Sequence, residues 1–305
     1  MKSNTTKESI TGIILAGGSS SRFGFNKLKI KVNSVPLFID QILKLCFFCD
    51  EIIISTSTKN YSFISYELDK INSYIQSYNF KKIQASNPKI NFKDFFIRTT
   101  PPLNVKIVSD EDTYKKFSKK SSFNAGDSGK SKSCRSKIGP ILGIYSGLTN
   151  ATHFYSMVIA SDMPFISYNI LNLLSGITGQ AYKKSDSNKT APSPAPEQVY
   201  GKTAYTFKTG KGLETLCSLY SKDTLHVLGK KIKEKKYRVS DVLISANTGI
   251  LNGEKNGSAG IDSLNFFNIN HKMDYDRFKN IWKSKKALLN INTTSAGVWS
   301  DFFFR

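Results

Sequence analysis

Residues 15–27 combine glycines, small hydroxyl residues and two basic side chains directly after an apolar run. Gly17 and Gly18 lack a Cβ atom, so the backbone can approach a ligand closely, and the serines that follow leave N–H groups available as an anion-binding nest. Arg22 suits bidentate contact with a phosphate, and Lys27 supplies a compact positive charge. We expect this stretch to be a phosphate-binding loop.

The two commonest phosphate-binding motifs are absent from this stretch. No Gly-x-Gly-x-x-Gly follows the apolar run, as a dinucleotide-binding fingerprint requires. The Gly-Lys-Ser at 129–131 has Asn124 where a P-loop needs its first glycine. The loop at 15–27 therefore belongs to neither class.

Two acidic residues follow later apolar runs. Asp162 ends the run at 157–160 and precedes Pro164, and Asp110 follows the run at 105–108, with Asp112 as its nearest competitor. A carboxylate in such a position can hold Mg²⁺ against a triphosphate, because Mg²⁺ prefers one or two carboxylates together with phosphate oxygens and water. An aspartate after a strand can equally be a helix cap or a turn former.

The elements that position these residues are indicated by short apolar runs. Such runs are typical of buried parallel strands, and a strand, helix and strand within about 45 residues form a βαβ unit. Pro36 suits the first turn of a helix over residues 37–46. Strands are predicted at Gly12–Ala16, Glu51–Ser55, Val105–Val108, Tyr155–Ala160 and Phe266–Ile269, with a helix at Asp274–Trp282.

Polar stretches near 111–138, 183–198 and 245–262 are predicted to be loop insertions, because they are rich in Ser, Lys, Asn, Gly and Pro. No linker separates two segments that each have strands and helices of their own. We therefore expect a polar lead over residues 1–10, one α/β domain over residues 11–283 and a C-terminal tail over residues 284–305.

The formal net charge is +21, from 44 Lys and Arg against 23 Asp and Glu. Eight basic residues and one acid lie at 115–137, and six basic residues surround Glu234 at 230–238. This charge indicates an anionic partner, but no aromatic residues alternate with the lysines as stacking platforms for nucleic acid would require, so nucleic acid is disfavoured. No run reaches the roughly 18 apolar residues of a membrane helix, and the N-terminus is too polar for a signal peptide, so we expect no membrane association and a cytoplasmic protein.

Histidine and cysteine patterns do not indicate a catalytic or metal site. The three histidines are not paired with a Ser or Cys pattern. Cys46 and Cys49 have Cys-x-x-Cys spacing, but no second pair completes a zinc site and the surrounding residues are apolar. These cysteines are therefore predicted to pack in the core.

Several motifs together resemble the molybdenum cofactor guanylyltransferases, within the wider nucleotidyltransferase group. They are Leu-Ala-Gly-Gly at 15–18, Arg-x-Gly-x-x-Lys at 22–27, Val-Pro-Leu at 35–37, Gly-Pro-x-x-Gly at 139–143, Ser-Asp-Met-Pro-Phe at 161–165 and Phe-Asn-Ile-Asn at 267–270. The resemblance implies a Rossmann-like, three-layer α/β/α nucleotidyltransferase domain with a mostly parallel sheet.

The resemblance also implies roles for individual residues. Arg22, Lys27 and Asp162 would be catalytic, and Asp162 would bind Mg²⁺, the implied cofactor. The implied nucleotide-binding residues are Leu15, Ala16, Gly17, Gly18, Lys27, Ser57, Asp110 and Asp162. The implied acceptor-side residues are Gly139, Pro140, Asn268 and Asn270. Ser57 stands where the family usually has Asn. At positions 26–28 the expected sequence is Asp-Lys-Gly, whereas Asn26-Lys27-Leu28 is closer to the cytidylyltransferases.

The implied reaction transfers GMP from GTP to molybdopterin with release of pyrophosphate. A terminal phosphate of the acceptor would attack the α-phosphorus in line, and the loop amides, Arg22, Lys27 and Mg²⁺ would neutralise charge. The implied partners are the two substrates and a molybdenum enzyme or cofactor-biosynthesis protein. Alternatives are CTP as donor with molybdopterin or a sugar or isoprenoid phosphate as acceptor, a basic nucleic-acid-binding protein, and a non-catalytic nucleotide-binding accessory protein.

Overall fold

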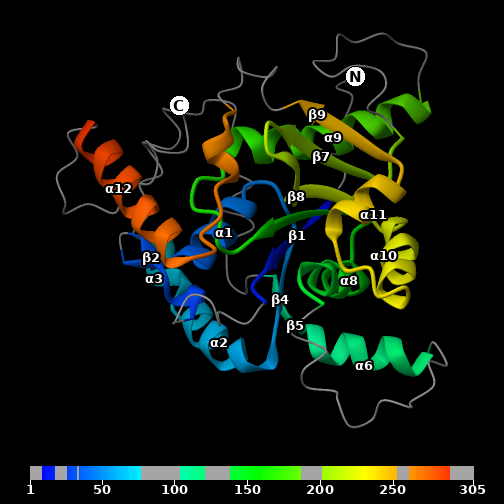
Figure 1. The fold of residues 1–305 in the computed structure, drawn as a ribbon, viewed down its shortest axis with the longest axis horizontal. Coiled ribbons are helices and arrows are strands. Elements are labelled where there is room, and N and C mark those ends of the chain that lie inside the picture. Colours follow the sequence, from blue (N-terminus) through cyan, green and yellow to red (C-terminus); the bar gives the residue numbers. More distant parts are fainter. Residues whose placement is uncertain are drawn as a thin grey trace, which may run out of the picture.

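The computed structural model describes residues 9–17, 26–32, 34–76, 104–120, 138–186, 201–252 and 261–288. A seven-stranded sheet in the order β5-β4-β1-β6-β8-β7-β9 forms the centre of the molecule (Figure 1). Four of its six strand pairs are parallel, so the predicted mostly parallel sheet is confirmed. A separate antiparallel pair joins β2 (Lys31–Val32) to β3 (Val35–Pro36).

The four strands of the parallel part that contains β1 were predicted as short apolar runs. They are β1 (Ile10–Leu15), β4 (Glu51–Thr56), β5 (Val105–Ser109) and β6 (Tyr155–Ala160). Helix α1 (Leu37–Leu45) connects β1 to its parallel neighbour β4, which confirms the βαβ unit. The strand pairs β1–β4, β4–β5 and β1–β6 are all parallel, so their carboxyl ends lie at one edge of the sheet.

The other half of the sheet reverses direction. Strand β8 (Gly212–Ser221) is antiparallel to both β6 and β7 (Ala204–Thr209), and β9 (Thr248–Asn252) runs parallel to β7 at the edge. None of these three strands was predicted. The predicted loop at 245–262 is therefore wrong over β9, which forms the last strand of the sheet.

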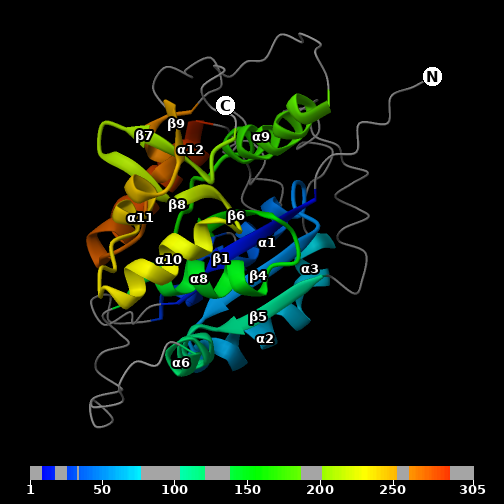
Figure 2. The same cartoon turned by 90° about the vertical axis from the view of Figure 1, so that its right-hand side faces the viewer.

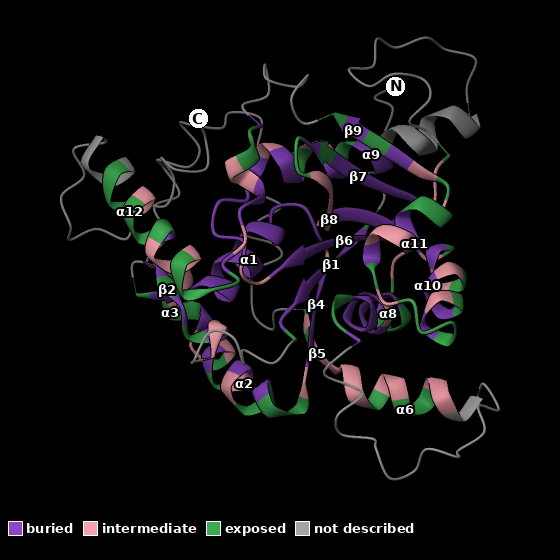
Figure 3. Cartoon of the chain, in the orientation of Figure 1, coloured by how far each residue is buried: buried purple, intermediate pink, exposed green. Residues whose placement is uncertain are grey.

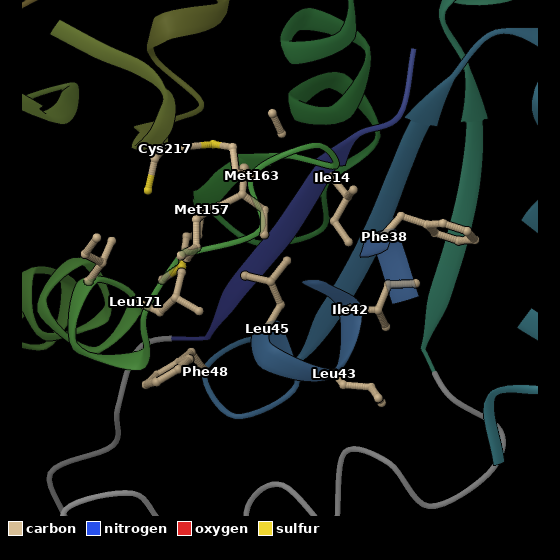
Figure 4. Close-up of a cluster of buried hydrophobic side chains, with 14 of the residues drawn as sticks. Ile14, Phe38, Ile42, Leu43, Leu45, Phe48, Met157, Met163, Leu171 and Cys217 are labelled. Carbon is tan, nitrogen blue, oxygen red and sulfur yellow. The ribbon is translucent and has the colours of Figure 1, made fainter. Parts of the chain in front are cut away.

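Helices cover both faces of the sheet, so the three-layer arrangement is confirmed (Figure 2). On one face, Ile14 of β1 packs in the apolar cluster formed with α1 and α9 (Tyr168–Asp186) (Figure 4). On the other face, Ile13 packs in a second cluster formed with α8 (Pro140–Asn150), α10 (Thr224–Lys233) and α11 (Val239–Ser245). Consecutive side chains of one strand thus reach opposite layers. Figure 3 shows that both α1 and the strands it covers are buried.

The remaining described elements lie around these layers. They are η2 (Lys27–Lys29), η3 (Thr58–Asn60), α2 (Tyr61–Asp69), α3 (Ile71–Gln76), α6 (Asp110–Lys120), η6 (Ser263–Phe266) and α12 (Lys272–Leu288). Helix α12 confirms the helix predicted over 274–282 and extends beyond it at both ends. No helix among the described residues is long and apolar enough to cross a membrane.

Three further predictions are wrong over the residues that the structure describes; residues 121–137 and 187–198 of the two predicted loops lie outside them. The stretch 111–138 begins with helix α6, whose first turn carries Asp110, Glu111 and Asp112, where acidic side chains complement the helix dipole. The predicted loop at 183–198 likewise begins with the last turn of α9. The predicted strand 266–269 is absent, because Phe266 ends a 3₁₀ helix capped by Asp262.

The core also contains a fully buried ion pair within α1. The Nζ atom of Lys44 lies 2.7 Å from Oδ2 of Asp40, one helical turn away, and neither side chain is exposed. Burial lowers the pKa of Lys44 to about 8, against the opposing attraction of Asp40. Cys46 and Cys49 are buried in the apolar cluster that contains α1, which confirms that they pack in the core.

Candidate functional site

The candidate site lies at the carboxyl ends of β1, β4, β5 and β6. Leu15 is paired in register with Ser55 of β4 and with Ala160 of β6, so the residues that follow these strands meet at one edge. The chain proceeds from β1 to β4 and β5 and then returns to the other side of β1 with β6. Open α/β sheets bind ligands at such a reversal of strand order.

Lys27, Asp162 and Asn270 meet on one side of the site. Lys27 Nζ donates to Asp162 Oδ2 at 3.1 Å and to Asn270 Oδ1 at 3.2 Å. The side chains of Lys27 and Asp162 are 21% and 19% exposed, so both are accessible to a ligand while largely shielded from water. Burial raises the pKa of Asp162, and the charge of Lys27 opposes this rise. Lys27, Asp162 and Asn270, one residue from each of three of the motifs, thus lie within hydrogen-bonding distance of one another through Lys27.

Backbone contacts position the segments that carry Asp162 and Asn270. The N–H of Ile269 donates to the carbonyl of Asp162 at 3.0 Å. The side chain of Gln41, on α1, donates to the carbonyl of Met163 at 2.8 Å. Asp274 Oδ2 accepts from the N–H of Asn270 at 2.9 Å and caps the start of α12. The turn after β6 is therefore tied both to α1 and to the chain leading into α12.

Asp110 lies on the other side of the site, against Gly17. A Cβ atom built on Gly17 would lie 2.8 Å from Asp110 Oδ2, and one built on Gly143 would lie 3.7 Å from the same oxygen. Ser55 donates a hydrogen bond to Asp110 Oδ1. Burial raises the pKa of Asp110 to about 7, although the Ser55 hydrogen bond opposes the rise. Gly17 leaves the space that this carboxylate occupies, and Gly143 lies next to it at ordinary contact distance.

Asp112, the competitor of Asp110 in the sequence, points elsewhere. It is exposed and forms a surface ion pair with Lys115 at 3.0 Å. Its hydrogen bond with Lys115 lowers its pKa. Of the two carboxylates, only that of Asp110 is directed at Gly17.

Helix α8 approaches β1 closely enough to bring its first turn to the site. It begins at Pro140, directly after Gly139, which has a positive φ of 69° that glycine adopts readily. A Cβ atom on Gly147 would lie 2.6 Å from Cγ2 of Ile13. Thr113 of α6 and Ser146 of α8 are hydrogen-bonded at 2.8 Å. The Gly-Pro-x-x-Gly motif therefore starts a helix that packs against both β1 and α6.

Sequence reasoning missed a group of polar residues that hold the two ends of the glycine-rich stretch. Thr56 Oγ1 donates to the carbonyl of Ala16 at 3.0 Å, and Asn60 Nδ2 donates to the same carbonyl at 3.2 Å. Asn26 Nδ2 donates to Asn60 Oδ1 at 3.1 Å. Thr56 and Asn60 are both buried. No sequence pattern marks them, because the contacts join residues about 40 positions apart.

The remaining predicted site residues have different environments. Gly18 and Arg22 lie outside the described residues. Ser57 precedes η3 and makes no side-chain capping bond to it. The Oδ1 atom of Asn268 is buried and has no hydrogen-bond partner within the described part of the chain. The structure therefore brings Gly17, Lys27, Asp110, Asp162 and Asn270 to one edge, with Gly139 and Pro140 at the helix that borders it.

The two basic segments of the sequence also approach each other. Phe117 of α6 lies against Gly229 of α10, where a Cβ atom would be 3.5 Å from the ring. The Nζ atom of Lys233 lies 5.8 Å from the centre of the Phe117 ring. The described parts of the stretches 115–137 and 230–238 therefore contribute to adjoining surfaces.

Comparisons with known proteins agree with the motifs. Residues 12–79 match the family model described as the MobA-like NTP transferase domain. A probable molybdenum cofactor guanylyltransferase of Thermococcus sibiricus is 24% identical over 268 residues, which cover 88% of this chain and 96% of that protein. A probable molybdenum cofactor guanylyltransferase of Pyrococcus horikoshii is also 24% identical, over 269 residues that cover 86% and 94%. The resemblance inferred from the motifs is confirmed.

A solved structure has the same fold. It is the molybdopterin-guanine dinucleotide biosynthesis protein A from Archaeoglobus fulgidus, with a TM-score of 0.55 and 17% sequence identity. The match covers 90% of this chain and all of that chain. The expected fold class is confirmed by this likeness.

Proposed function

We propose that this chain is a nucleotidyltransferase that transfers GMP from GTP to molybdopterin and releases pyrophosphate. The observation that carries the proposal is the convergence of Lys27, Asp162 and Asn270 at one edge of the sheet, opposite Gly17 and Asp110. One side of this site offers a fixed positive charge for phosphates. The other offers a carboxylate beside a glycine backbone, and the names of the curated relatives support the assignment of the substrates.

The carboxylate of Asp110 favours guanine as the base. A carboxylate accepts hydrogen bonds, and guanine presents two adjacent donors, N1–H and the N2 amino group, on one edge. Cytosine presents the N4 amino group beside N3, which only accepts. Asp110 Oδ2 lies where a Cβ on Gly17 would meet it, so a base held against the Gly17 backbone would be within reach of this oxygen.

Lys27 and Asp162 would bind the triphosphate. The described residues contain no group of three or more His, Cys, Asp or Glu side chains that could enclose a metal ion. The partly exposed carboxylate of Asp162 and the amide oxygen of Asn270 nevertheless fit Mg²⁺, which keeps several waters and completes its shell with phosphate oxygens. Asp162 would hold the ion, which when bound would neutralise phosphate charge.

The proposed reaction requires correct positioning of the two substrates and no covalent nucleophile from the protein. Lys27 would turn from Asp162 toward the phosphates when a nucleotide binds and would offset the charge that develops on the departing pyrophosphate. Asp162 would keep Lys27 in place before binding. Asn270, next to the capped start of α12, would stand between the nucleotide and the acceptor phosphate, whose oxygen would attack the α-phosphorus in line.

The experiment measures pyrophosphate release with GTP and molybdopterin in the presence of Mg²⁺, together with calorimetric affinities for GTP, CTP and UTP. We expect release with GTP, dependence on the metal, and tighter binding of GTP than of CTP. Tighter binding of CTP would overturn the assignment of the base. Binding of GTP without release under any phosphate acceptor would indicate a non-catalytic nucleotide-binding protein instead.

A further inference from the structure

Asn60 joins the two ends of the glycine-rich stretch through its side-chain amide. Its Nδ2 atom lies 3.2 Å from the carbonyl oxygen of Ala16, where β1 ends, and 3.4 Å from Thr56 Oγ1. Its Oδ1 atom accepts from Asn26 Nδ2 at 3.1 Å. Asn26 directly precedes Lys27 in the sequence. One buried side chain therefore contacts both residues that border the segment 17–25.

The orientation of both amides follows from the groups at the two ends of this chain of hydrogen bonds. The Ala16 carbonyl can only accept, so the amino group of Asn60 must face it. The N–H of Leu28 can only donate, and Asn26 Oδ1 accepts from it at 3.0 Å. Asn26 must then direct its amino group at Asn60 Oδ1. Every donor in the chain meets an acceptor in a single arrangement.

The same contacts set the direction of the peptide between Ala16 and Gly17. The Ala16 carbonyl accepts from both Thr56 Oγ1 and Asn60 Nδ2, so its oxygen is held on their side. In a trans peptide the C=O and N–H bonds point in opposite directions. The N–H of Gly17 is thereby directed away from Asn60.

We propose that Asn60 is a positioning residue that fixes the Gly17 amide and Lys27 relative to each other. Gly17 belongs to the side of the site that contains Asp110, and Lys27 to the side that contains Asp162. A ligand that spans both sides, as a nucleoside triphosphate does in the proposed function on which this inference rests, binds tightly only when their separation is preset. Asn60 contacts no substrate in this role and acts through Ala16 and Asn26.

Two substitutions remove the contact in different ways. Asn60→Asp keeps the size of the side chain but replaces the amino group that donates to the Ala16 carbonyl with a negatively charged oxygen. This carboxylate oxygen and the Ala16 carbonyl oxygen repel each other. Asn26→Ala leaves the Ala16 contact intact and removes the connection to the Lys27 end, together with the hydrogen bond that Asn26 Oδ1 accepts from the N–H of Leu28. Each substitution breaks the same series of hydrogen bonds, which runs from Ala16 through Asn60 to Asn26. The Asn60→Asp/Asn26→Ala double variant is therefore expected to lose little more GTP affinity than Asn60→Asp alone.

A control is available at the amino ends of the strands, away from the candidate site. Asn104 Nδ2 donates to the carbonyl of Asp50 at 3.1 Å, which is the same type of bond between an asparagine and a backbone carbonyl. Asn104 precedes β5, and Asp50 precedes β4. Asn104→Ala therefore tests whether the loss of any such bond has the effect expected for Asn60.

The experiment measures GTP affinity by calorimetry and backbone amide exchange of the ligand-free chain, both well below the melting temperature. We expect Asn60→Asp and Asn26→Ala each to weaken GTP binding about tenfold or more, a change that the loss of one well-placed hydrogen bond can produce. Amide exchange should accelerate at residues 26–30 in both variants. Asn104→Ala should change neither quantity.

The outcomes separate this inference from the proposed function. Unchanged GTP affinity, or unchanged exchange at residues 26–30, in Asn60→Asp and Asn26→Ala would overturn the inference. An equal loss in Asn104→Ala would also overturn it, because the effect would then be one of general stability. A wild-type chain that binds no nucleoside triphosphate would overturn the proposed function, while the exchange data alone would decide whether Asn60 holds the two ends.

Discussion

The ammonium group of Lys27 lies 3.1 Å from Oδ2 of Asp162, although the two residues are 135 positions apart in the sequence. Each partner keeps the other in place in the absence of ligand. Burial raises the pKa of Asp162, and Lys27 counteracts that rise. Removal of Lys27 thus takes away a phosphate contact and also favours protonation of the carboxylate beside it.

We expect Lys27→Ala and Asp162→Ala each to lower the rate of pyrophosphate release by at least about 100-fold, the usual effect of removing one group that stabilises developing charge. The double variant should be little worse than either single variant, because the residues act together. Pyrophosphate release is measured with GTP and molybdopterin, with thermal unfolding as the control for folding. Wild-type rates in either single variant would refute the assignment of the site.

Stability should depend on pH through Asp110. Burial raises its pKa from the usual 3.8 to about 7, so between these values the folded chain binds a proton that the unfolded chain has released. The contribution of Asp110 to the free energy of unfolding therefore decreases as the pH rises from about 4 to about 7 and is constant above that. Denaturant unfolding of the wild type and Asp110→Asn over this range measures it.

Asp110→Asn cannot titrate and can still accept the bond from Ser55. It should gain stability relative to the wild type as the pH rises through this window. A difference in unfolding free energy that is independent of pH would contradict the raised pKa. The variant should also bind GTP more weakly than the wild type at pH 8, where the wild-type carboxylate is ionised.

A methyl group at Gly17 should disturb the site more than the fold. The added Cβ would lie 2.8 Å from Asp110 Oδ2, so the carboxylate must move. We expect Gly17→Ala to weaken GTP binding about tenfold or more. The matched control is Gly176→Ala on α9, where a Cβ meets nothing within 4 Å. That substitution should leave binding unchanged and add about 0.5–1 kcal/mol of stability, as alanine does when it replaces glycine in a helix.

Glu51 should stabilise the sheet at the amino end of β4, away from the candidate site. Burial alone would raise its pKa, but hydrogen bonds from Lys106, Thr152 and Thr11 outweigh burial and lower the pKa to about 2. Its stabilising contribution is present above about pH 4.5 and is lost as the pH falls toward 2. Glu51→Ala leaves the buried Thr11 hydroxyl without its acceptor, whereas the exposed Thr152 and the half-exposed Lys106 can bond to water. The substitution should lower the free energy of unfolding at pH 7 by roughly 1–3 kcal/mol.

Denaturant unfolding at pH 7 checks the loss expected for Glu51→Ala. Activity of the folded variant is the second readout, because Glu51 is at the start of β4 while the candidate site lies beyond its end. A large fall in kcat without a fall in stability would show that this separation is wrong.

Three of the four strands that were predicted correctly, β1, β4 and β6, are buried along their whole length, and only β5 is partly exposed. Ile52, Ile53 and Ile54 form a continuous apolar run because helices cover both sides of β4. Strand β8 was missed because its sequence, from Gly212 to Ser221, mixes Glu, Thr and Ser with apolar residues. Phe266 and Phe267 resemble a strand locally, but Asp262 caps a 3₁₀ turn there and the chain continues by bonding to the loop after β6.

Some residues of the candidate site could likewise be predicted from the sequence, and others could not. Lys27 and Asp162 could be predicted because each follows an apolar run within a recognisable motif, and the strand order then brings them together. Asn60 could not, because its importance depends on partners at Ala16 and Asn26 that only the folded chain places beside it. A preference for Asp110 over Asp112 likewise needed the direction of each side chain on α6.

The close contact between Gly147 and Ile13 limits how the candidate site can change during evolution or design. Because a Cβ on Gly147 would lie 2.6 Å from Cγ2 of Ile13, the backbone of α8 rests directly on this side chain of β1 and cannot move closer. Any larger residue at position 147 would lift the helix, and Gly143 would move away from Asp110 with it. A change of base preference is therefore more accessible through side chains at positions such as 55 and 110 than through a shift of α8. The glycine thus sets the distance between α8 and β1 behind the candidate site.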